Sequence, residues 1–411
     1  MTKLTVKSRG PESFILKRLP EEAFTYRDMT KGDLISSNNG QFTGKNVGRS
    51  VLFPSQEINN SQLCLKDLIK PPSIIEHKFY AVGTYESPAV NLYRLDNCFI
   101  SNIHGVILRT DIDAFFGPSA RFLQKRPMYG INRDNDQEIN LPLDLTKAAI
   151  KVDTALVFHS AAVNNYYHWH IETLPLLMAL REDIESEKIV PIWSRKPNGF
   201  QAASLEAMGL LKFVKSISSE LIYAKRAFWG STLKSFPYSR FTPLIGQTFD
   251  YIKKRELAKV KGIKANLPKH IHIIRPDMGR RPLLNEKDLT QALQPLGCEP
   301  IDPGKLSYNE QIQLFNGAET IVAQHGGGLT NIGFCKAGTK VLEIVGENYV
   351  NPCFWGLGHI KGALYAAVAA KAVDRDDVKN KNAAANIDIE ATLSVYKDLK
   401  ARRVDTVGVG R

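Results

Sequence analysis

The sequence has no long hydrophobic run: its 411 residues contain no stretch of the ~18 consecutive apolar residues that a membrane helix needs. The most apolar windows, at 154–163 and 363–370, are short and interrupted by polar side chains. The first ten residues carry charges but lack the apolar segment of a secretory signal. Internal repeats and low-complexity tracts are absent as well. These absences predict an ordinary globular protein that works in the cytoplasm.

Cysteine is scarce, and its spacing carries no sign of a disulfide framework or a zinc site. No two cysteines form a Cys-x-x-Cys pair, and their number is odd. This pattern predicts free thiols in a reducing compartment. The five residues are Cys64, Cys98, Cys298, Cys335 and Cys353.

Acidic residues are outnumbered by basic ones, with 42 Asp and Glu against 54 Lys and Arg and a net charge of +12. Such an excess favours an anionic partner, for example a phosphorylated substrate or the anionic inner face of a membrane. A basic, soluble surface without such a partner is an equal alternative. No zinc-finger or RNA-recognition signature accompanies the charge, so we expect no nucleic acid partner.

Strand-like and helix-like segments alternate in two series along the chain. The alternation, with short connections, predicts α/β domains built on parallel sheets. The expected divisions are an irregular N-terminal arm (1–75), an α/β domain on the acceptor side (76–245), a linker (246–268), a second Rossmann-like domain that binds the nucleotide sugar (269–375), and a tail with a final helix (376–411).

A glycine-rich turn lies between a predicted strand and a predicted helix in the second series. Three glycines allow positive φ and a close approach of the backbone to a ligand. The start of the helix would direct free N–H groups and the positive end of its dipole at that ligand, which suits phosphate. A tight turn without a ligand is the alternative. The predicted donor-binding residues here are His325, Gly326, Gly327, Gly328, Leu329, Thr330 and Asn331.

The same turn resembles the His-Gly-Gly-Gly oxyanion loop of lipases and esterases. That interpretation requires a Gly-x-Ser-x-Gly nucleophile sequence, and the chain contains none. An esterase-like hydrolase is therefore kept only as an alternative. A non-catalytic protein that binds nucleotides or glycans is a second alternative.

Arginines follow the first strand of the second series, where Arg275 ends the strand and Arg280 and Arg281 lie in the next loop. Ligands bind at the carboxyl ends of parallel strands, so these arginines could clamp a diphosphate. Solvated surface arginines are the alternative. Asn285 is expected at the N-cap of the following helix and joins the donor-binding set. Glu343 interrupts a hydrophobic strand and needs a partner, either a ribose hydroxyl pair or a structural ion pair.

A helix predicted at 165–180 carries Asn165, His168 and Glu172 on one face, at positions i, i+3 and i+7. Histidine and glutamate on such a face could supply a general base, or could form structural hydrogen bonds. With His170 nearby they could also bind a metal, but no further ligands accompany them. Pro175 should bend this helix or lie at an irregular turn.

In this order, the segments make the chain resemble glycosyltransferase family 61 over residues 155–365. This family includes plant β-1,2-xylosyltransferases, animal O-linked N-acetylglucosaminyltransferases and bacterial envelope-polysaccharide enzymes. The resembling motifs are residues 165–175, Arg275 with 280–286, 307–318 continuing through 324–334, and 338–344. Gly327 stands where the family usually has alanine, and His170 where an apolar residue is commoner.

The resemblance implies a GT-B fold, in which two Rossmann-like domains face each other across a cleft. It also implies an inverting glycosyltransferase whose nucleotide-sugar donor, expected to be UDP-linked, is held by the second half. The acceptor would be a hydroxyl of a glycan or lipid-linked glycan, as in capsule or envelope polysaccharide synthesis. We expect Glu172 to be the base, His168 to orient it, and Asn165 and His170 to lie on the acceptor side. Eukaryotic members carry a membrane anchor or a signal, so their absence indicates a bacterial cytoplasmic enzyme, peripheral at most on the inner membrane.

No Asp-x-Asp sequence stands near the arginines and the glycine turn. Those at 111–113 and 134–136 lie outside the second half, and that at 374–376 lies beyond its last predicted strand. We therefore expect no obligatory metal and no cofactor beyond the nucleotide-sugar co-substrate.

Overall fold

The computed structural model divides the chain into two compact units. Unit 1 comprises Met1–Pro54 and Ala89–Leu233, and unit 2 comprises Ser55–Pro88 and Lys234–Arg411. The residues that the structure describes are 14–19, 47–77, 80–102, 105–109, 114–116, 138–141, 150–158, 163–235, 239–259, 267–275, 280–373 and 380–403. The three Asp-x-Asp sequences lie outside them. Within these ranges, no helix has both the length and the apolar character needed to cross a bilayer.

The units do not follow the sequence-based divisions. Residues 55–75, expected in an irregular arm, supply strands to unit 2, among them β4 (Cys64–Lys70), which pairs in parallel with β20 (Leu364–Ala372). The expected linker begins inside α8 (Leu244–Ala258), which also belongs to unit 2. A strand whose partner lies 300 residues away along the chain leaves no local signal, so the sequence could not assign β4 to a sheet.

Among its described residues, unit 1 is built on a mixed sheet of ten strands. Its order is β12 (Lys215–Ser216), β11 (Pro191–Trp193), β10 (Ile150–Val157), β13 (Leu221–Gly230), β6 (Val90–Ser101), β7 (Val106–Arg109), β8 (Ala114–Phe116), β1 (Phe14–Leu19) and β9 (Glu138–Leu141), with β2 (Val47–Phe53) also paired to β6. The pairs among β10, β11, β12 and β13 are parallel, whereas β6 is antiparallel to β13 and to β7. The predicted parallel layer is therefore confirmed for one part of the sheet only. Short connections join β6 to β7 and β7 to β8, and they favour antiparallel pairs.

The helices of unit 1 follow the parallel strands. The helix predicted at 165–180 is divided into α4 (Tyr166–His168), a π-helical turn (Trp169–Thr173) and α5 (Leu174–Ala179). The division lies just before Pro175, which has no N–H group and cannot continue a regular α-helix. Further helices among the described residues of unit 1 are α6 (Arg181–Glu185), α7 (Gly199–Met208) and a short 3-10 helix (Leu211–Phe213).

In the part of unit 2 that the structure describes, seven strands form a mainly parallel sheet. Its order is β17 (Glu299–Ile301), β16 (His270–Ile273), β18 (Thr320–Gln324), β19 (Lys340–Gly346), β20 and β21 (Ala385–Ile387), with β4 also paired to β20. Only β21 is antiparallel to its neighbour. The strands of the parallel series alternate with helices, as the sequence predicts for a Rossmann-like domain.

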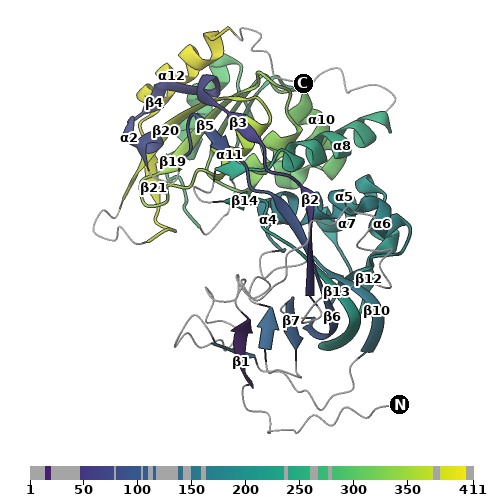
Figure 1. Ribbon diagram of the computed structural model, residues 1–411. Coiled ribbons are helices and arrows are strands. Elements are labelled where there is room, and N and C mark those ends of the chain that lie inside the picture. Colours follow the sequence, from purple (N-terminus) through teal and green to yellow (C-terminus); the bar gives the residue numbers. More distant parts are fainter. Residues whose placement is uncertain are drawn as a thin grey trace, which may run out of the picture. The chain divides into compact units, whose positions relative to one another are not determined.

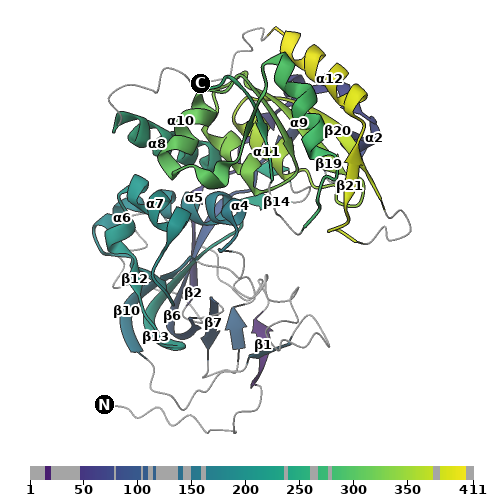
Figure 2. The same ribbon diagram turned by 180° about the vertical axis from the view of Figure 1, so that it is seen from behind.

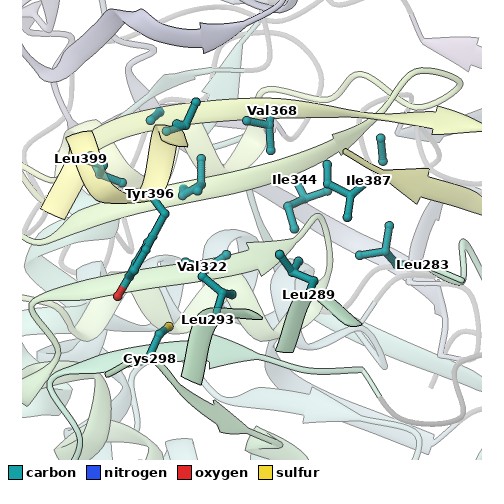
Figure 3. Close-up of a cluster of buried hydrophobic side chains, with 14 of the residues drawn as sticks. Leu283, Leu289, Leu293, Cys298, Val322, Ile344, Val368, Ile387, Tyr396 and Leu399 are labelled. Carbon is teal, nitrogen blue, oxygen red and sulfur yellow. The ribbon is translucent and has the colours of Figure 1, made fainter. Parts of the chain in front are cut away.

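Helices cover both faces of the unit 2 sheet (Figures 1 and 2). One face carries α9 (Glu286–Leu293) and α12 (Ile389–Ala401), and the other carries α8, α10 (Tyr308–Gly317) and α11 (Cys353–Ile360). Figure 3 shows the core under α9 and α12, where Leu289 and Tyr396 pack with Val322, Ile344 and Val368 of the sheet. The final helix thus belongs to the core of unit 2.

Candidate functional site

The helical segment that carries His168 and Glu172 is fixed by large buried side chains on its other face. Trp169 is fully buried, stacks on Trp193 of β11 with ring centroids 5.6 Å apart, and donates from Nε1 to Ser204 Oγ at 2.8 Å. Seven residues further on, Leu176 packs directly on Gly230 of β13, where an added Cβ would lie 2.3 Å from Leu176 Cδ1. These apolar contacts hold the polar face of the segment in place.

Asn165 acts as the cap of this segment. Its Oδ1 accepts hydrogen bonds from the backbone N–H groups of Tyr167, at 2.9 Å, and His168, at 3.3 Å. These are N–H groups that a helix start leaves without an internal partner. The residue expected on the acceptor side thus has a local structural task, which positions His168.

His168 and Glu172 lie against each other, as their spacing predicts. His168 Nδ1 is 3.0 Å from Glu172 Oε1, a contact of ion-pair distance rather than an aligned hydrogen bond. The side chain of His168 is 31% exposed and that of Glu172 is 14% exposed, so both are partly buried but still accessible to solvent. A partly desolvated carboxylate beside an imidazole has the chemistry of a general base that can share its proton.

His170 lies inside the unit, not on its surface. It is 1% exposed, donates from Nδ1 to the carbonyl of Tyr166 at 2.8 Å, and its ring centroid lies 4.1 Å from that of Tyr166. Burial lowers its pKa to about 4, so the ring is neutral near pH 7. His170 therefore contributes to the packing of unit 1, and its place on the acceptor side stays a prediction. Its packing partner Phe200 lies 30 residues further on, in α7, and no local pattern reveals that contact.

Metal ligands do not gather around this pair. Across the described part of the chain, no group of three or more His, Cys, Asp or Glu side chains could hold a metal ion. All five cysteines are buried free thiols, in agreement with their spacing.

In unit 2, the residues that follow three adjacent parallel strands lie at one edge of the sheet. Arg275 follows β16, His325 follows β18, and Tyr349 follows β19. Because β16, β18 and β19 pair in parallel, their carboxyl ends lie together. The sequence predicted the first two residues at this edge and missed Tyr349.

The glycine turn is compressed against Arg275. A Cβ on Gly326 would lie 3.1 Å from Arg275 Nε, and one on Gly328 would lie 3.0 Å from Ile273 Cγ2. Neither glycine has positive φ, so close approach, and not left-handed backbone, explains them. The expectation of positive φ was wrong here. Gly327 is exposed and has open space around it, so the turn presents backbone to solvent at that point.

The segment after the glycines is a 3-10 helix, Gly327–Phe334, in place of the predicted α-helix. Its first N–H groups still lack partners within the helix. Leu329, Thr330 and Asn331 are at most 1% exposed, and Asn331 donates from Nδ2 to Gln311 Oε1 at 2.9 Å. These three residues form the floor of the turn, while Gly327 and Gly328 remain the accessible part.

Arg275 ties the turn to its surroundings. Its guanidinium donates to the carbonyl of His325 at 3.1 Å, to Gln324 Oε1 at 3.3 Å and to the carbonyl of Arg280 at 3.3 Å. Burial lowers the pKa of Arg275, the nearby charge of Arg281 lowers it further, and Glu286 opposes the shift. The arginine therefore shapes the site and adds positive charge to it.

Arg281 is held over the face of Tyr349, with Cζ 4.5 Å from the ring centroid. Its backbone has a φ of 53°, a left-handed conformation that costs a non-glycine residue free energy. Gln324 Nε2 donates to the Arg281 carbonyl at 2.8 Å and helps to hold this conformation. Arg281 Nε is buried and has no hydrogen-bond partner among the described residues. Arg280, in contrast, is exposed.

Glu343 lies deeper, within β19, and is fully buried. Oε1 lies 2.5 Å from His325 Nδ1, and Oε2 accepts a hydrogen bond from Tyr365 Oη at 2.7 Å. Both oxygens are thus engaged by protein side chains. Of the two kinds of partner that the sequence left open, the structure shows protein side chains, because His325 and Tyr365 take both carboxylate oxygens.

Asn285 stands at the N-cap position of α9, but its side chain binds the backbone of β21. Its Nδ2 donates to the carbonyl of Ile387 at 2.8 Å, and its Oδ1 accepts from the N–H of Ile387 at 3.0 Å. The side chain makes no capping bond and instead links the start of α9 to β21. The residue type and position suggested a cap, but a strand 102 residues away takes both of its polar groups.

The comparison with known proteins covers residues from both groups of side chains. No curated protein matches the chain. Residues 166–342 match the family model Glycosyltransferase 61, and the matched segment includes Glu172, Arg275, Arg281 and His325. Asn165 and Glu343 fall one residue outside its two ends. The chain therefore contains a glycosyltransferase family 61 domain, which implies that it transfers a sugar from a donor to an acceptor.

Proposed function

We propose that the protein is an inverting GT-B glycosyltransferase that moves a sugar from a UDP-sugar to a hydroxyl of a glycan acceptor. The observation that carries this proposal is the convergence of Arg275, Arg281 and the glycine turn at one edge of the unit 2 sheet. Positive charge, free backbone N–H groups and an accessible glycine are the features that bind a diphosphate.

Arg281 is the main contact to the donor diphosphate in this proposal. Its Nε is desolvated and has no partner within the described part of the chain, which costs free energy unless a ligand accepts from it. Its guanidinium is already oriented by Tyr349, so little side-chain entropy is lost when an anion binds. Arg275 contributes charge from behind the turn, and Gly327 and Gly328 contribute backbone N–H groups.

The transfer is a single displacement at the anomeric carbon of the sugar. Glu172 accepts the proton of the acceptor hydroxyl while the hydroxyl oxygen forms the new bond. The bond from the anomeric carbon to the diphosphate breaks, and the diphosphate leaves with the electron pair. His168, in contact with Glu172, orients the carboxylate and shares the proton. Attack opposite the leaving group inverts the configuration.

The leaving diphosphate gains negative charge as its bond breaks. Preorganised donors directed at developing charge typically contribute several kcal/mol to catalysis. In this proposal Arg275, Arg281 and the 3-10 helix start supply that stabilisation, so transfer needs no divalent cation.

The acceptor is proposed to be a glycan or lipid-linked glycan of a bacterial capsule or envelope polysaccharide. The net charge of +12 supports transient contact with an anionic inner membrane, where such acceptors are found. The enzyme itself is proposed to work in the cytoplasm.

A ligand screen tests the proposal. Thermal unfolding is followed with UDP, ADP, GDP and inorganic phosphate, each at equal concentration. We expect UDP to raise the unfolding temperature most, because a ligand that binds only the folded state stabilises it by mass action. Hydrolysis and transfer are then measured with UDP-sugars. Nucleotide binding without transfer to any acceptor would favour a binding protein, and labelling by a serine-reactive phosphonate would favour a hydrolase.

A further inference from the structure

The buried carboxylate of Glu343 belongs to a connected group of side chains beneath the glycine turn. On one side it meets His325, the first residue of the turn, at 2.5 Å. On the other side it accepts from Tyr365 in β20 at 2.7 Å. Tyr80 lies close to Tyr365 and to the same carboxylate. All four side chains are less than 9% exposed, so the group is almost isolated from water.

The tyrosines of this group stay protonated. Burial raises the pKa of Tyr365 well above its ordinary value, and the charge of Glu343 raises it further. Burial and the same charge raise the pKa of Tyr80. Tyr365 can therefore act only as a neutral donor toward Oε2, which leaves Oε1 to accept from His325.

The backbone of His325 is fixed as firmly as its ring. Its N–H donates to the carbonyl of Ile344 in β19 at 2.9 Å, and its own carbonyl accepts from Arg275 at 3.1 Å. The ring edge that carries Nδ1 faces Glu343, and the ring packs on Tyr349 and Phe354. A histidine whose Nδ1–H is taken by a carboxylate has a defined tautomer, and its other nitrogen is directed to a different side.

We infer that Glu343 is a positioning residue that acts through His325: its carboxylate fixes the Nδ1–H tautomer and the ring orientation of His325, and thereby the glycine turn that receives the donor diphosphate. This inference deepens the proposed function and rests on it for the identity of the ligand. Glu343 itself touches no ligand. Tyr365 holds the carboxylate in the orientation that His325 requires.

If Glu343 and His325 only stabilised the fold, a substitution of Glu343 would lower stability alone. If Glu343 positions His325, the substitution also changes the tautomer of His325, and this readout separates the two roles. The protein is labelled with 15N-histidine, and long-range proton–nitrogen correlation spectra record which ring nitrogen carries the proton. The His325 signal is identified by its loss in His325→Gln. UDP affinity is measured on the same samples by calorimetry, and thermal stability is measured in parallel.

Glu343→Gln keeps the size of the side chain but offers His325 either an oxygen or an NH2 group. We expect the Nδ1–H signature of His325 to be lost or mixed, and the Kd for UDP to rise about tenfold, the equivalent of one charge-assisted hydrogen bond. The matched control is Glu319→Gln, which changes an exposed glutamate at the opposite end of β18, paired with Lys269. It should alter neither the signature nor the affinity.

A folded Glu343→Gln protein with an unchanged His325 signature and unchanged UDP affinity would overturn the inference. A Glu343→Gln protein that loses stability but keeps the His325 signature and the UDP affinity would overturn it as well. Should Glu343→Gln fail to fold, Tyr365→Phe carries the test: the Nδ1–H signal should shift and UDP binding should weaken severalfold, and no change in either would contradict the inference. If the wild-type protein does not bind UDP, the proposed function fails, whereas the signature still tests the pairing of Glu343 with His325.

Discussion

Arg281 allows binding and stability to be separated by two substitutions at one position. Its φ of 53° costs a non-glycine residue about 1 kcal/mol, and glycine is free of that cost. Its guanidinium contributes a cation–π contact with Tyr349, worth about 0.5–1 kcal/mol at a partly exposed site. Arg281→Gly relieves the backbone strain and the unpaired Nε while it loses the cation–π contact, so its free energy of unfolding should not fall below that of the wild type. Arg281→Ala retains the backbone strain and should be about 1 kcal/mol less stable than Arg281→Gly.

Both substitutions should weaken UDP binding equally. A lost charge-assisted hydrogen bond is worth about 1.5–3 kcal/mol, so the Kd should rise about 10- to 150-fold. Calorimetric titration gives the affinity, and urea unfolding gives the stability of the same samples. Arg403→Ala, which removes an exposed arginine after α12, is the charge-matched control. Folded Arg281 variants that bind UDP as tightly as the wild type would remove this residue from the donor site. If Arg281→Ala were more stable than Arg281→Gly, the argument from backbone strain would be wrong.

Four further changes have defined outcomes. Glu172→Gln should lower transfer about 10²- to 10⁴-fold with little change in UDP affinity, and retention of more than about a tenth of the activity would show that Glu172 is not the base. EDTA should leave transfer nearly intact if arginines stabilise the leaving group; complete loss that manganese or magnesium restores would refute this. Gly326→Ala places a methyl group 3.1 Å from Arg275 Nε and should weaken UDP binding at least as much as it lowers stability, which titration and thermal unfolding compare. Burial lowers the pKa of His272 from 6.5 to about 4, so the unfolded chain binds more protons between these values. Its contribution to stability should therefore fall by up to about 3 kcal/mol as the pH drops through this window, and His272→Gln should show a shallower loss in urea unfolding at pH 7 and pH 4.5.

Features that depend on neighbours in sequence were predictable. The Ser-x-x-Glu pattern at Ser307 and Glu310 forms a complete capping box at the start of α10. The contact between His168 and Glu172 follows from their spacing of four residues. The convergence of Arg275 and His325 follows from the rule that parallel strands end at one edge. In each case, a few residues and a general rule determine the geometry.

Features that depend on distant partners were not predictable. Asn285 satisfies the preference for a cap but is bound by β21, and His170 has the polarity of a surface residue but is enclosed by Tyr166 and Phe200. Burial depends on which elements pack together. A single sequence reveals the alternation of strands and helices, but it does not reveal that β4 and β20 lie side by side in one sheet.

The surroundings of Glu343 show what kind of sequence signal could have helped. In the sheet, Glu343 lies opposite Ala323 of β18 and Ala367 of β20. Side chains alternate across a strand, so His325, two residues beyond Ala323, and Tyr365, two residues before Ala367, project from the same face as Glu343. The alanines leave the space in which the larger side chains meet the carboxylate. A buried acidic residue that has small residues opposite it on both neighbouring strands, and polar residues two positions along those strands, therefore indicates that the polar side chains bind the carboxylate. Once the strand order is known, this pattern can be recognised from the residues alone.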